Sequence, residues 1–255
     1  MKLIDWVAIL GALAWTPHLI SMIRNWLSKP EIRVITPRSV SLGFTTLGSI
    51  FNLHLAFAVK NKDIVISSIK LKLKHETGGE KNFEWQGIQQ QVMKMKIPDG
   101  SVLPYEKEQS VLAMKLNQKD IVERFIQFQE KFFIEEKYAR ENKALKNIAY
   151  LKSQEKYDPM EFMSSQDMQE LVKYIQQSFY WQVGTYEVTI QVESPEPFVI
   201  KGNKYLFSLT PLDIEALENN KDFIENDYKN ILVPQSDEEF KKVEWKWRNP
   251  PLQKT

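Results

Sequence analysis

The chain has 255 residues, with 34 basic and 33 acidic side chains and a net charge of +1 at pH 7. Because the two signs are balanced and interleaved, nothing in the composition favours a nucleic-acid partner. The absence of cysteine excludes a disulfide framework and thiol catalysis, and it fits a reducing compartment. The length suffices for one large or two small domains with a hydrophobic core.

The first predicted element is a helix over residues 3–27, in which no charged residue falls between Trp6 and Ile23. Trp6 and Trp26 lie twenty positions apart. That separation is ~30 Å along a helix, close to the thickness of the hydrocarbon core of a bilayer, and tryptophan is favoured at both membrane interfaces. We therefore predict a transmembrane anchor over residues 1–28. Its anchor residues are Trp6, Trp15, Pro17, His18 and Trp26.

Three other interpretations of this stretch stay open: a cleaved signal peptide, a helix lying in the membrane interface, and a helix buried in a soluble core. A signal peptide needs a basic start and a small-residue cleavage site, whereas Asp5 offsets Lys2 and the apolar run ends in bulky residues. An interfacial helix needs a strongly polar face, and this stretch offers only a thin polar seam. The transmembrane interpretation is therefore preferred.

Flanking charge predicts the orientation of the anchor. Only Lys2 precedes it, while Arg24, Lys29, Arg33 and Arg38 follow it. Because basic residues favour the cytoplasmic side, we expect a single-pass protein with its N-terminus outside and its body in the cytoplasm.

Within the anchor, three features could do more than anchor the chain, although the plainer explanation is that the proline and histidine are neutral and that alanine is simply common in spans. Pro17 is expected to kink the helix, and His18 lies near the middle of the membrane, where an ionisable group is costly. Ala8, Ala12 and Thr16 form a row of small residues that would let a second helix approach closely. A homo-oligomer formed through this row is therefore a candidate.

Beyond the anchor, short segments alternate between apolar and polar residues, as is typical of half-buried strands. The clearest covers residues 52–60, whose large apolar side chains share one face. Ile64 and Ile66 are in the opposite phase to Ile69, which predicts a bulge near Ser67. Further strands are predicted over 31–36, 69–74, 82–86 and 109–116, with a loop over 37–48.

Helical spacing replaces this alternation from residue 118 to about residue 151, where Phe125, Phe128, Phe132 and Phe133 supply more apolar rows than one contact needs. A second helix is expected to begin at the capping sequence Asp158-Pro159-x-Glu161. Its one-sided apolar face consists of Met168, Leu171, Val172, Ile175 and Phe179.

Strands return over residues 186–192 and 205–209, and a short helix is expected after the cap Thr210-Pro211-x-Asp213. Alternation at Val243, Trp245 and Trp247 predicts a late strand. Six to eight short strands with one helical interruption predict a mainly β fold, an immunoglobulin-like antiparallel β-sandwich that carries a helical hairpin insertion. The predicted parts are the anchor 1–28, the first sandwich strands 29–117, the helical insertion 118–180, and the last strands with the tail 181–255.

The search for chemistry finds no phosphate-binding loop, nucleophile elbow or metal-binding motif. His75 is in phase with Leu71 and Leu73, whereas His54 is out of phase with its apolar neighbours, so the two should face different environments. We therefore expect no enzyme, no metal and no cofactor, although a hydrolase with an unrecognised site stays open.

Two sets of basic residues are candidates for contact with lipid headgroups. Arg24 and Lys29 flank the anchor, while Lys70, Lys72 and Lys74 form a row on the solvent face of a strand. Lysines also simply protect exposed strands from edge pairing, which is the plainer explanation for the row.

The sequence thus predicts a membrane-anchored, non-catalytic binding or scaffolding module that holds a protein partner at the bilayer. The insertion and the loops at one end of the sandwich are the expected contact surfaces. The alternative is a membrane effector or channel accessory whose anchors self-associate in response to a signal sensed by the body.

Overall fold

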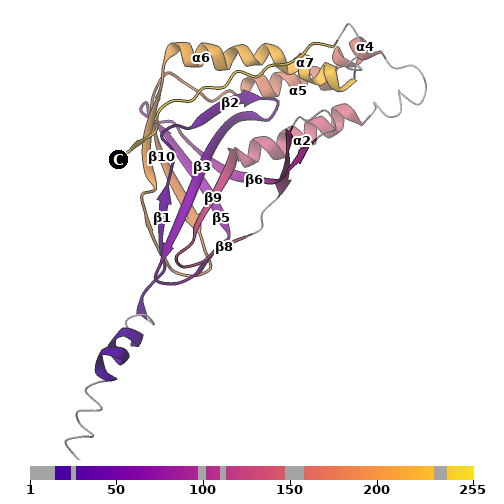
Figure 1. The fold of residues 1–255 in the computed structure, drawn as a ribbon. Coiled ribbons are helices and arrows are strands. Elements are labelled where there is room, and N and C mark those ends of the chain that lie inside the picture. The colour runs from indigo at the N-terminus through magenta and orange to yellow at the C-terminus, as the bar shows by residue number, and fades with distance from the viewer. Residues whose placement is uncertain (1–14, 24–26, 97–101, 110–112, 147–157, 233–239) are drawn as a thin grey trace, which may run out of the picture.

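The chain is mainly β, with one large curled sheet and a group of helices at one end (Figure 1). The computed structural model describes residues 15–23, 27–96, 102–109, 113–146, 158–232 and 240–255. The strands are β1 (Glu31–Ile35), β2 (Ser41–Thr45), β3 (Gly48–Lys60), β4 (Ile64–Ile66), β5 (Ser68–His75), β6 (Glu80–Lys96), β7 (Val102–Gln109), β8 (Met114–Leu116), β9 (Ile121–Gln129), β10 (Gly184–Glu193), β11 (Val199–Lys201), β12 (Lys204–Leu209) and β13 (Gln253–Lys254). The helices are α2 (Lys131–Leu145), α4 (Pro159–Met163), α5 (Gln166–Gln177), α6 (Pro211–Glu218), the 3₁₀ turn η1 (Asn219–Asp222) and α7 (Phe223–Leu232).

An eleven-stranded mixed sheet organises the body, in the order β11-β1-β3-β9-β6-β5-β10-β12-β13, with β2 also on β3 and β7 also on β6. β11 and β12 stand near opposite ends of this order, yet only Gly202 and Asn203 join them. The sheet must therefore curl until its two ends meet, and β11 pairs in parallel with β1. Gly202 has a φ of 70° and passes so close to β1 that a Cβ would lie 2.9 Å from the carbonyl oxygen of Val34. Only glycine fits both the left-handed backbone and the close approach.

The C-terminal tail also helps to join the two ends of the curled sheet. Leu42 and Arg248 exchange two backbone hydrogen bonds of 2.8 and 3.0 Å, and the backbone N–H of Leu252 donates to the carbonyl of Arg38 at 2.7 Å. The predicted late strand thus lies further along the chain than expected: pairing begins at Arg248 and the strand itself is β13.

The main core fills the inside of the curl. Period-two alternation on β3 is confirmed, because Leu53, Leu55, Phe57 and Val59 are all buried there. β5, β10 and β12 contribute their own inward rows, and aromatic rings from the segment after α5 close the end of the core beside the helices.

A second core lies among the helices. The predicted face of α5 is confirmed, since Met168, Leu171, Val172 and Ile175 are buried against α2 and α7. Both predicted caps form, since Asp158 accepts a hydrogen bond from the backbone of Met160, and Thr210 and Asp213 form a reciprocal capping box. The helix expected to continue from Asp158 is interrupted, however, because α4 ends at Met163 and α5 begins only at Gln166.

The prediction of one helix over residues 118–151 is wrong in its first part. Residues 121–129 form β9, a central strand between β3 and β6, and the helix begins at Lys131. The apolar residues of this stretch suit either periodicity, but as a strand the segment buries Ile126 and Phe128 and bonds to two neighbours. Pairing with the two neighbouring strands therefore determines that this segment is a strand and not a helix.

The sandwich prediction is not confirmed, since the strands from β1 to β13 belong to one curled sheet apart from the two-stranded pair β4 and β8. This pair also explains the phase change near Ser67. β4 leaves the main sheet to pair with β8, so the chain changes sheets there instead of forming a bulge. The segment predicted as a loop over 37–48 contains β2, which pairs with the first residues of β3.

Residues 15–23 are helical and project from the end of the body opposite the helices (Figure 1). Within the part of the chain that the structure describes, no helix has the length and apolar character needed to cross a membrane. The predicted anchor residues Trp6 and Trp26 lie outside the described residues.

Candidate functional site

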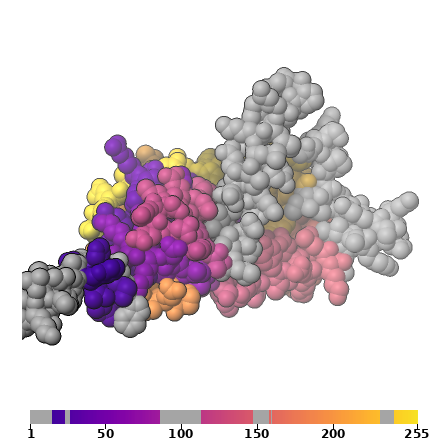
Figure 2. All heavy atoms as spheres, turned by 60° about the horizontal axis from the view of Figure 1, so that its bottom comes forward, coloured from indigo at the N-terminus to yellow at the C-terminus, as the bar shows by residue number. Residues whose placement is uncertain are grey.

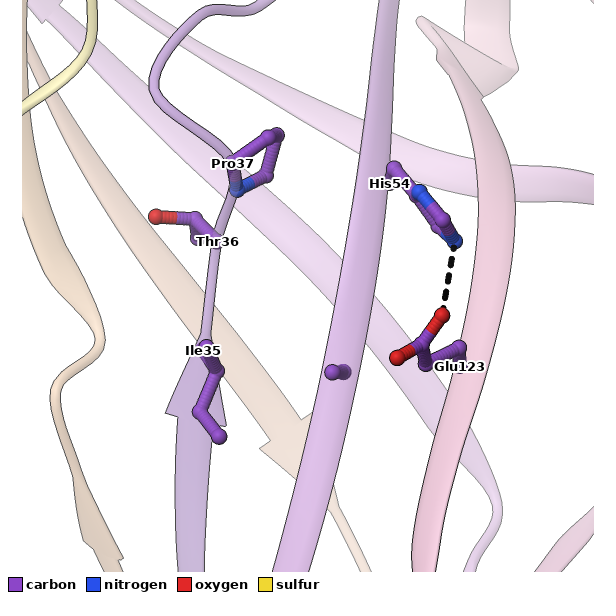
Figure 3. Close-up of a pocket in the computed structure, with 6 residues that line it drawn as sticks. Ile35, Thr36, Pro37, His54 and Glu123 are labelled. Atoms are coloured by element: carbon purple, nitrogen blue, oxygen red, sulfur yellow. Dashed lines mark ion pairs between the residues drawn. The ribbon is translucent and has the colours of Figure 1, made fainter.

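A small hollow on the outer face of β3 is the first candidate site (Figure 3). Its volume is about 180 Å³, and its walls include Ile35, Thr36, His54 and Glu123. His54 Nε2 lies 3.7 Å from a carboxylate oxygen of Glu123, and both side chains are more than half exposed. Figure 3 shows the Thr36 hydroxyl pointing away from this pair. Ligand pockets usually enclose several hundred cubic ångströms, and an exposed His–Glu pair without an oriented nucleophile does not constitute a catalytic site.

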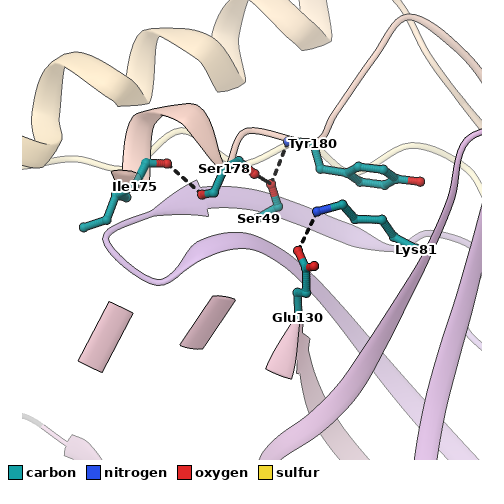
Figure 4. A network of polar contacts seen from close by, with 6 residues as sticks. All are labelled: Ser49, Lys81, Glu130, Ile175, Ser178 and Tyr180. Atoms are coloured by element: carbon teal, nitrogen blue, oxygen red, sulfur yellow. Dashed lines mark hydrogen bonds and ion pairs between the residues drawn. The ribbon is translucent and has the colours of Figure 1, made fainter. Parts of the chain in front are cut away.

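A polar network at the helix end of the curl is the second candidate (Figure 4). The backbone N–H of Tyr180 donates to Ser49 Oγ at 3.1 Å, and the Ser178 hydroxyl donates to the last turn of α5 at 2.7 Å. Lys81 forms an ion pair with Glu130 beside them, and its Nζ lies 5.3 Å from the centre of the Tyr180 ring. Burial raises the pKa of Tyr180 to about 12, so the phenol stays neutral at physiological pH. These contacts fasten the end of α5 to the start of β3, and we interpret them as structural.

Between α2 and α7 lies a third cluster, and it is the most deeply buried of the three. Lys137 Nζ lies 2.8 Å from Glu141, with only 5 % of the lysine side chain and 17 % of the glutamate side chain exposed. The hydroxyl of Tyr228 donates to the same carboxylate at 2.8 Å, and burial and that carboxylate both raise the pKa of Tyr228. Thr46 donates to Asp227 nearby, and burial raises the pKa of Asp227. The cluster joins two helices to the β2–β3 turn and opens into no described pocket.

The lysine row lies on the outer face of β5, as the alternation predicts, with Leu71 and Leu73 buried on the other face. Its lysines are opposed by carboxylates from both neighbouring strands. Lys70 lies 2.8 Å from Glu193, and Lys72 lies 2.7 Å from Glu80. The hydrogen bond from Glu193 raises the pKa of Lys70. The row is therefore a mixed-charge surface, and headgroup contact through it stays a prediction.

The two body histidines differ as predicted. His75 is buried, with hydrogen bonds from its ring nitrogens to Thr77 and to the Val183 carbonyl, whereas His54 is exposed. Among the described residues, no group of three or more His, Asp or Glu side chains is arranged to hold a metal ion.

The exposed apolar surface of the N-terminal segment is the candidate functional site that remains. Six large apolar side chains of residues 15–27 have at least half of their area exposed. They are Trp15, Leu19, Ile20, Met22, Ile23 and Leu27. The predicted residues Trp15, Thr16, Pro17 and His18 lie in this segment, whereas Ala8, Ala12 and Arg24 lie outside the described residues.

The chain matches no known protein-family model, no curated protein and no solved structure. A functional conclusion therefore rests on the geometry above. Sequence reasoning singled out the N-terminal segment and the lysine row but missed the Lys137–Glu141 pair. Its only sequence signal is an i, i+4 spacing of opposite charges, which is usual on solvent-exposed helices.

Proposed function

We propose that the chain is a single-pass membrane protein and that its body is a non-catalytic binding or scaffolding module holding a protein partner at the bilayer. The observation that carries this proposal is the apolar segment of residues 15–23, which projects from the body with its large side chains in solvent, as does Leu27. Contiguous apolar surface of this kind is unfavourable in water and marks a membrane or partner contact. In the proposal, the span extends over residues 1–28 and the body is cytoplasmic.

A plausible partner surface lies at the other end of the body. α2 carries Phe132, which is 72 % exposed, and Tyr138, which is half exposed. Aromatic side chains on a rigid helix supply much of the binding energy in protein interfaces. The inner face of the same helix is fixed by Phe133 and Ile134, so the exposed rings are held in place.

The anchor is tested by carbonate extraction of membranes from cells expressing the full chain. We expect the wild-type protein to stay in the pellet and Trp15→Asp to move to the supernatant, because an acidic side chain near the centre of a span costs about 3 kcal/mol. Leu212→Asp is the matched control, since Leu212 is 73 % exposed and lies on α6, outside the proposed span. A wild-type protein that is itself released by carbonate would overturn the proposal.

Topology is tested with the same cells, because the chain has no cysteine of its own. A Ser164→Cys variant should react with an impermeant maleimide only after the cells are lysed. Labelling in intact cells would place the body outside and would overturn the proposed orientation. Partner capture by the full chain should then fall in a Phe132→Ser variant and persist in Leu212→Ser.

A further inference from the structure

We propose that the end of the body from which the N-terminal segment emerges docks onto an anionic lipid surface. This anchor end consists of residues 28–33, 60–63, 115–121 and 193–204. The inference rests on the proposed function, because it assumes that the apolar segment enters a bilayer. It adds a second, electrostatic contact made by the folded body itself.

A short, fixed linker brings the anchor end to the membrane. Only residues 28–30 separate Leu27 from β1, and three extended residues span roughly 10 Å. The side-chain amide of Asn61 donates to the Lys29 carbonyl at 3.0 Å, and the backbone N–H of Val199 donates to the Pro30 carbonyl at 2.9 Å. These bonds hold the turn after β3 and the start of β11 against the linker. A span that ends near Leu27 therefore leaves both within about one Debye length of the headgroups.

Figure 2 brings this end of the molecule forward: indigo N-terminal residues lie beside purple and orange ones from later in the chain. Strand pairing places the same segments together. Lys60 at the end of β3 lies opposite Glu31, and Ile121 at the start of β9 lies opposite Ala58. The anchor end is thus a single surface built from four separate segments.

Charge favours an anionic surface here. The anchor end carries eight basic and five acidic side chains, a net charge of +3, while the whole chain carries +1. Three of the acids already have cationic partners, since Glu31 lies 2.7 Å from Lys201, Asp63 lies 3.5 Å from Lys115 and Glu193 lies 2.8 Å from Lys70. Lys60 and Lys119 are exposed.

Lys119 stands in an unusual backbone conformation. Its φ is 78°, in the left-handed region that glycine and asparagine occupy more easily than lysine. The turn around it is closed by a 3.1 Å hydrogen bond from Asn117 to Asp120, which leaves Lys119 in the tight connection between β8 and β9. The connection presents the Lys119 side chain to solvent at the surface of the anchor end.

Two exposed aliphatic side chains accompany these charges. Ile121 is 63 % exposed two residues after Lys119, and Val199 is 44 % exposed beside the linker. Apolar side chains next to lysines suit the headgroup boundary, where the aliphatic part enters the bilayer and the ammonium meets phosphate. The surface therefore has both components of an interfacial contact. The row of Lys70, Lys72 and Lys74 is less suited, because carboxylates oppose it.

The test uses the full chain bound to vesicles, with a fluorophore on Gln118→Cys at the anchor end or on Gln177→Cys at the helix end. The vesicles contain phosphatidylcholine alone or with about 30 % phosphatidylserine, and a lipid with a quencher on its headgroup reports proximity. We expect phosphatidylserine to increase quenching at position 118 and not at position 177. Lys60→Glu/Lys119→Glu should abolish the increase, while Lys146→Glu/Lys173→Glu, exposed lysines on the helices with the same charge change, should retain it.

The expected size follows from a contribution of about fivefold per basic residue near an anionic surface, so the double reversal should weaken docking at least roughly 25-fold. A flotation assay distinguishes failure of the proposed anchor from failure of the docking surface alone. A protein that floats with vesicles of neither composition overturns the proposed anchor and this inference with it. A protein that floats with both, but whose quenching ignores phosphatidylserine or the two lysines, overturns the docking surface alone.

Discussion

Removing the carboxylate of Glu141 should destabilise the protein more than removing the whole ion pair. Glu141→Leu leaves the ammonium of Lys137, whose side chain is only 5 % exposed, without its 2.8 Å partner, and it leaves the Tyr228 hydroxyl without its acceptor. Breaking a buried pair costs about 3–5 kcal/mol, and an unpaired buried hydroxyl adds about 1 kcal/mol. The ring of Tyr138, 4.7 Å from the lysine Nζ, compensates in part. If that compensation is about 1 kcal/mol, we expect a loss of about 4 kcal/mol, or roughly 8–16 °C in Tm.

The double variant Lys137→Met/Glu141→Leu is the decisive comparison. It removes both charges and fills the same space with apolar groups, so its free energy of unfolding should lie within about 1 kcal/mol of the wild-type value. Urea unfolding followed by tryptophan fluorescence measures all three proteins, with unchanged m values required for the comparison. Equal stability of the single and double variants would refute the argument that the unpaired lysine causes the loss.

Three further predictions concern stability. Gly48→Ala should lose roughly 2 kcal/mol in urea unfolding, because Gly48 has a φ of 76° and an added Cβ would lie 2.5 Å from the ring of Phe133; wild-type stability would contradict this. Trp181→Phe should lose about 2 kcal/mol in the same assay, because it removes the 2.9 Å hydrogen bond from Nε1 to the buried carbonyl of Gly43. For Asp227, burial raises the folded pKa above its unfolded value, so its contribution is fully present below the unfolded pKa and is lost as pH rises through the folded pKa. The stability of wild type relative to Asp227→Asn should therefore fall from pH 3 to pH 7, and a rise would show that the carboxylate is stabilised instead.

The sequence was most informative where local pattern and tertiary packing agree. α5 has a one-sided apolar face, and Met168, Leu171, Val172 and Ile175 are buried as that face predicts. β3 shows clean alternation because its inner face meets the core and its outer face meets solvent along residues 53–59. In both elements, tertiary packing favours the same secondary structure as the local sequence pattern.

Residues 121–129 could not be assigned from the sequence for a physical reason. Their apolar positions fit a helix as well as a strand, and the deciding term is pairing with β3 and with β6. The parallel pairing of β1 with β11 joins residues about 170 positions apart in the chain, which no local periodicity encodes. The curl that replaces the predicted sandwich depends on that pairing.

The candidate site was predictable in part. Charge-free sequence with spaced tryptophans singled out the N-terminal segment, and the large apolar side chains of residues 15–23 and of Leu27 are exposed. The basic anchor end was not predictable, because it is assembled from loops that only the strand order brings together. The alternation placed Lys70 and Lys72 on the outer face correctly, but their partners Glu193 and Glu80 come from other strands.

The strand order also determines how the helix end and the anchor end of the molecule are connected. β3 has thirteen residues and runs from the helix end to the anchor end, a length of ~43 Å for an extended strand. It pairs with β1, β2 and β9, and the curl is closed by β11 and by the C-terminal tail. Because the edges of this sheet are joined, we expect the body to act as a stiff spacer. In the proposed orientation, the exposed rings of α2 are held several nanometres from the bilayer. A bound partner would thus be held at a fixed distance from the membrane, as expected of a scaffold that positions its partner.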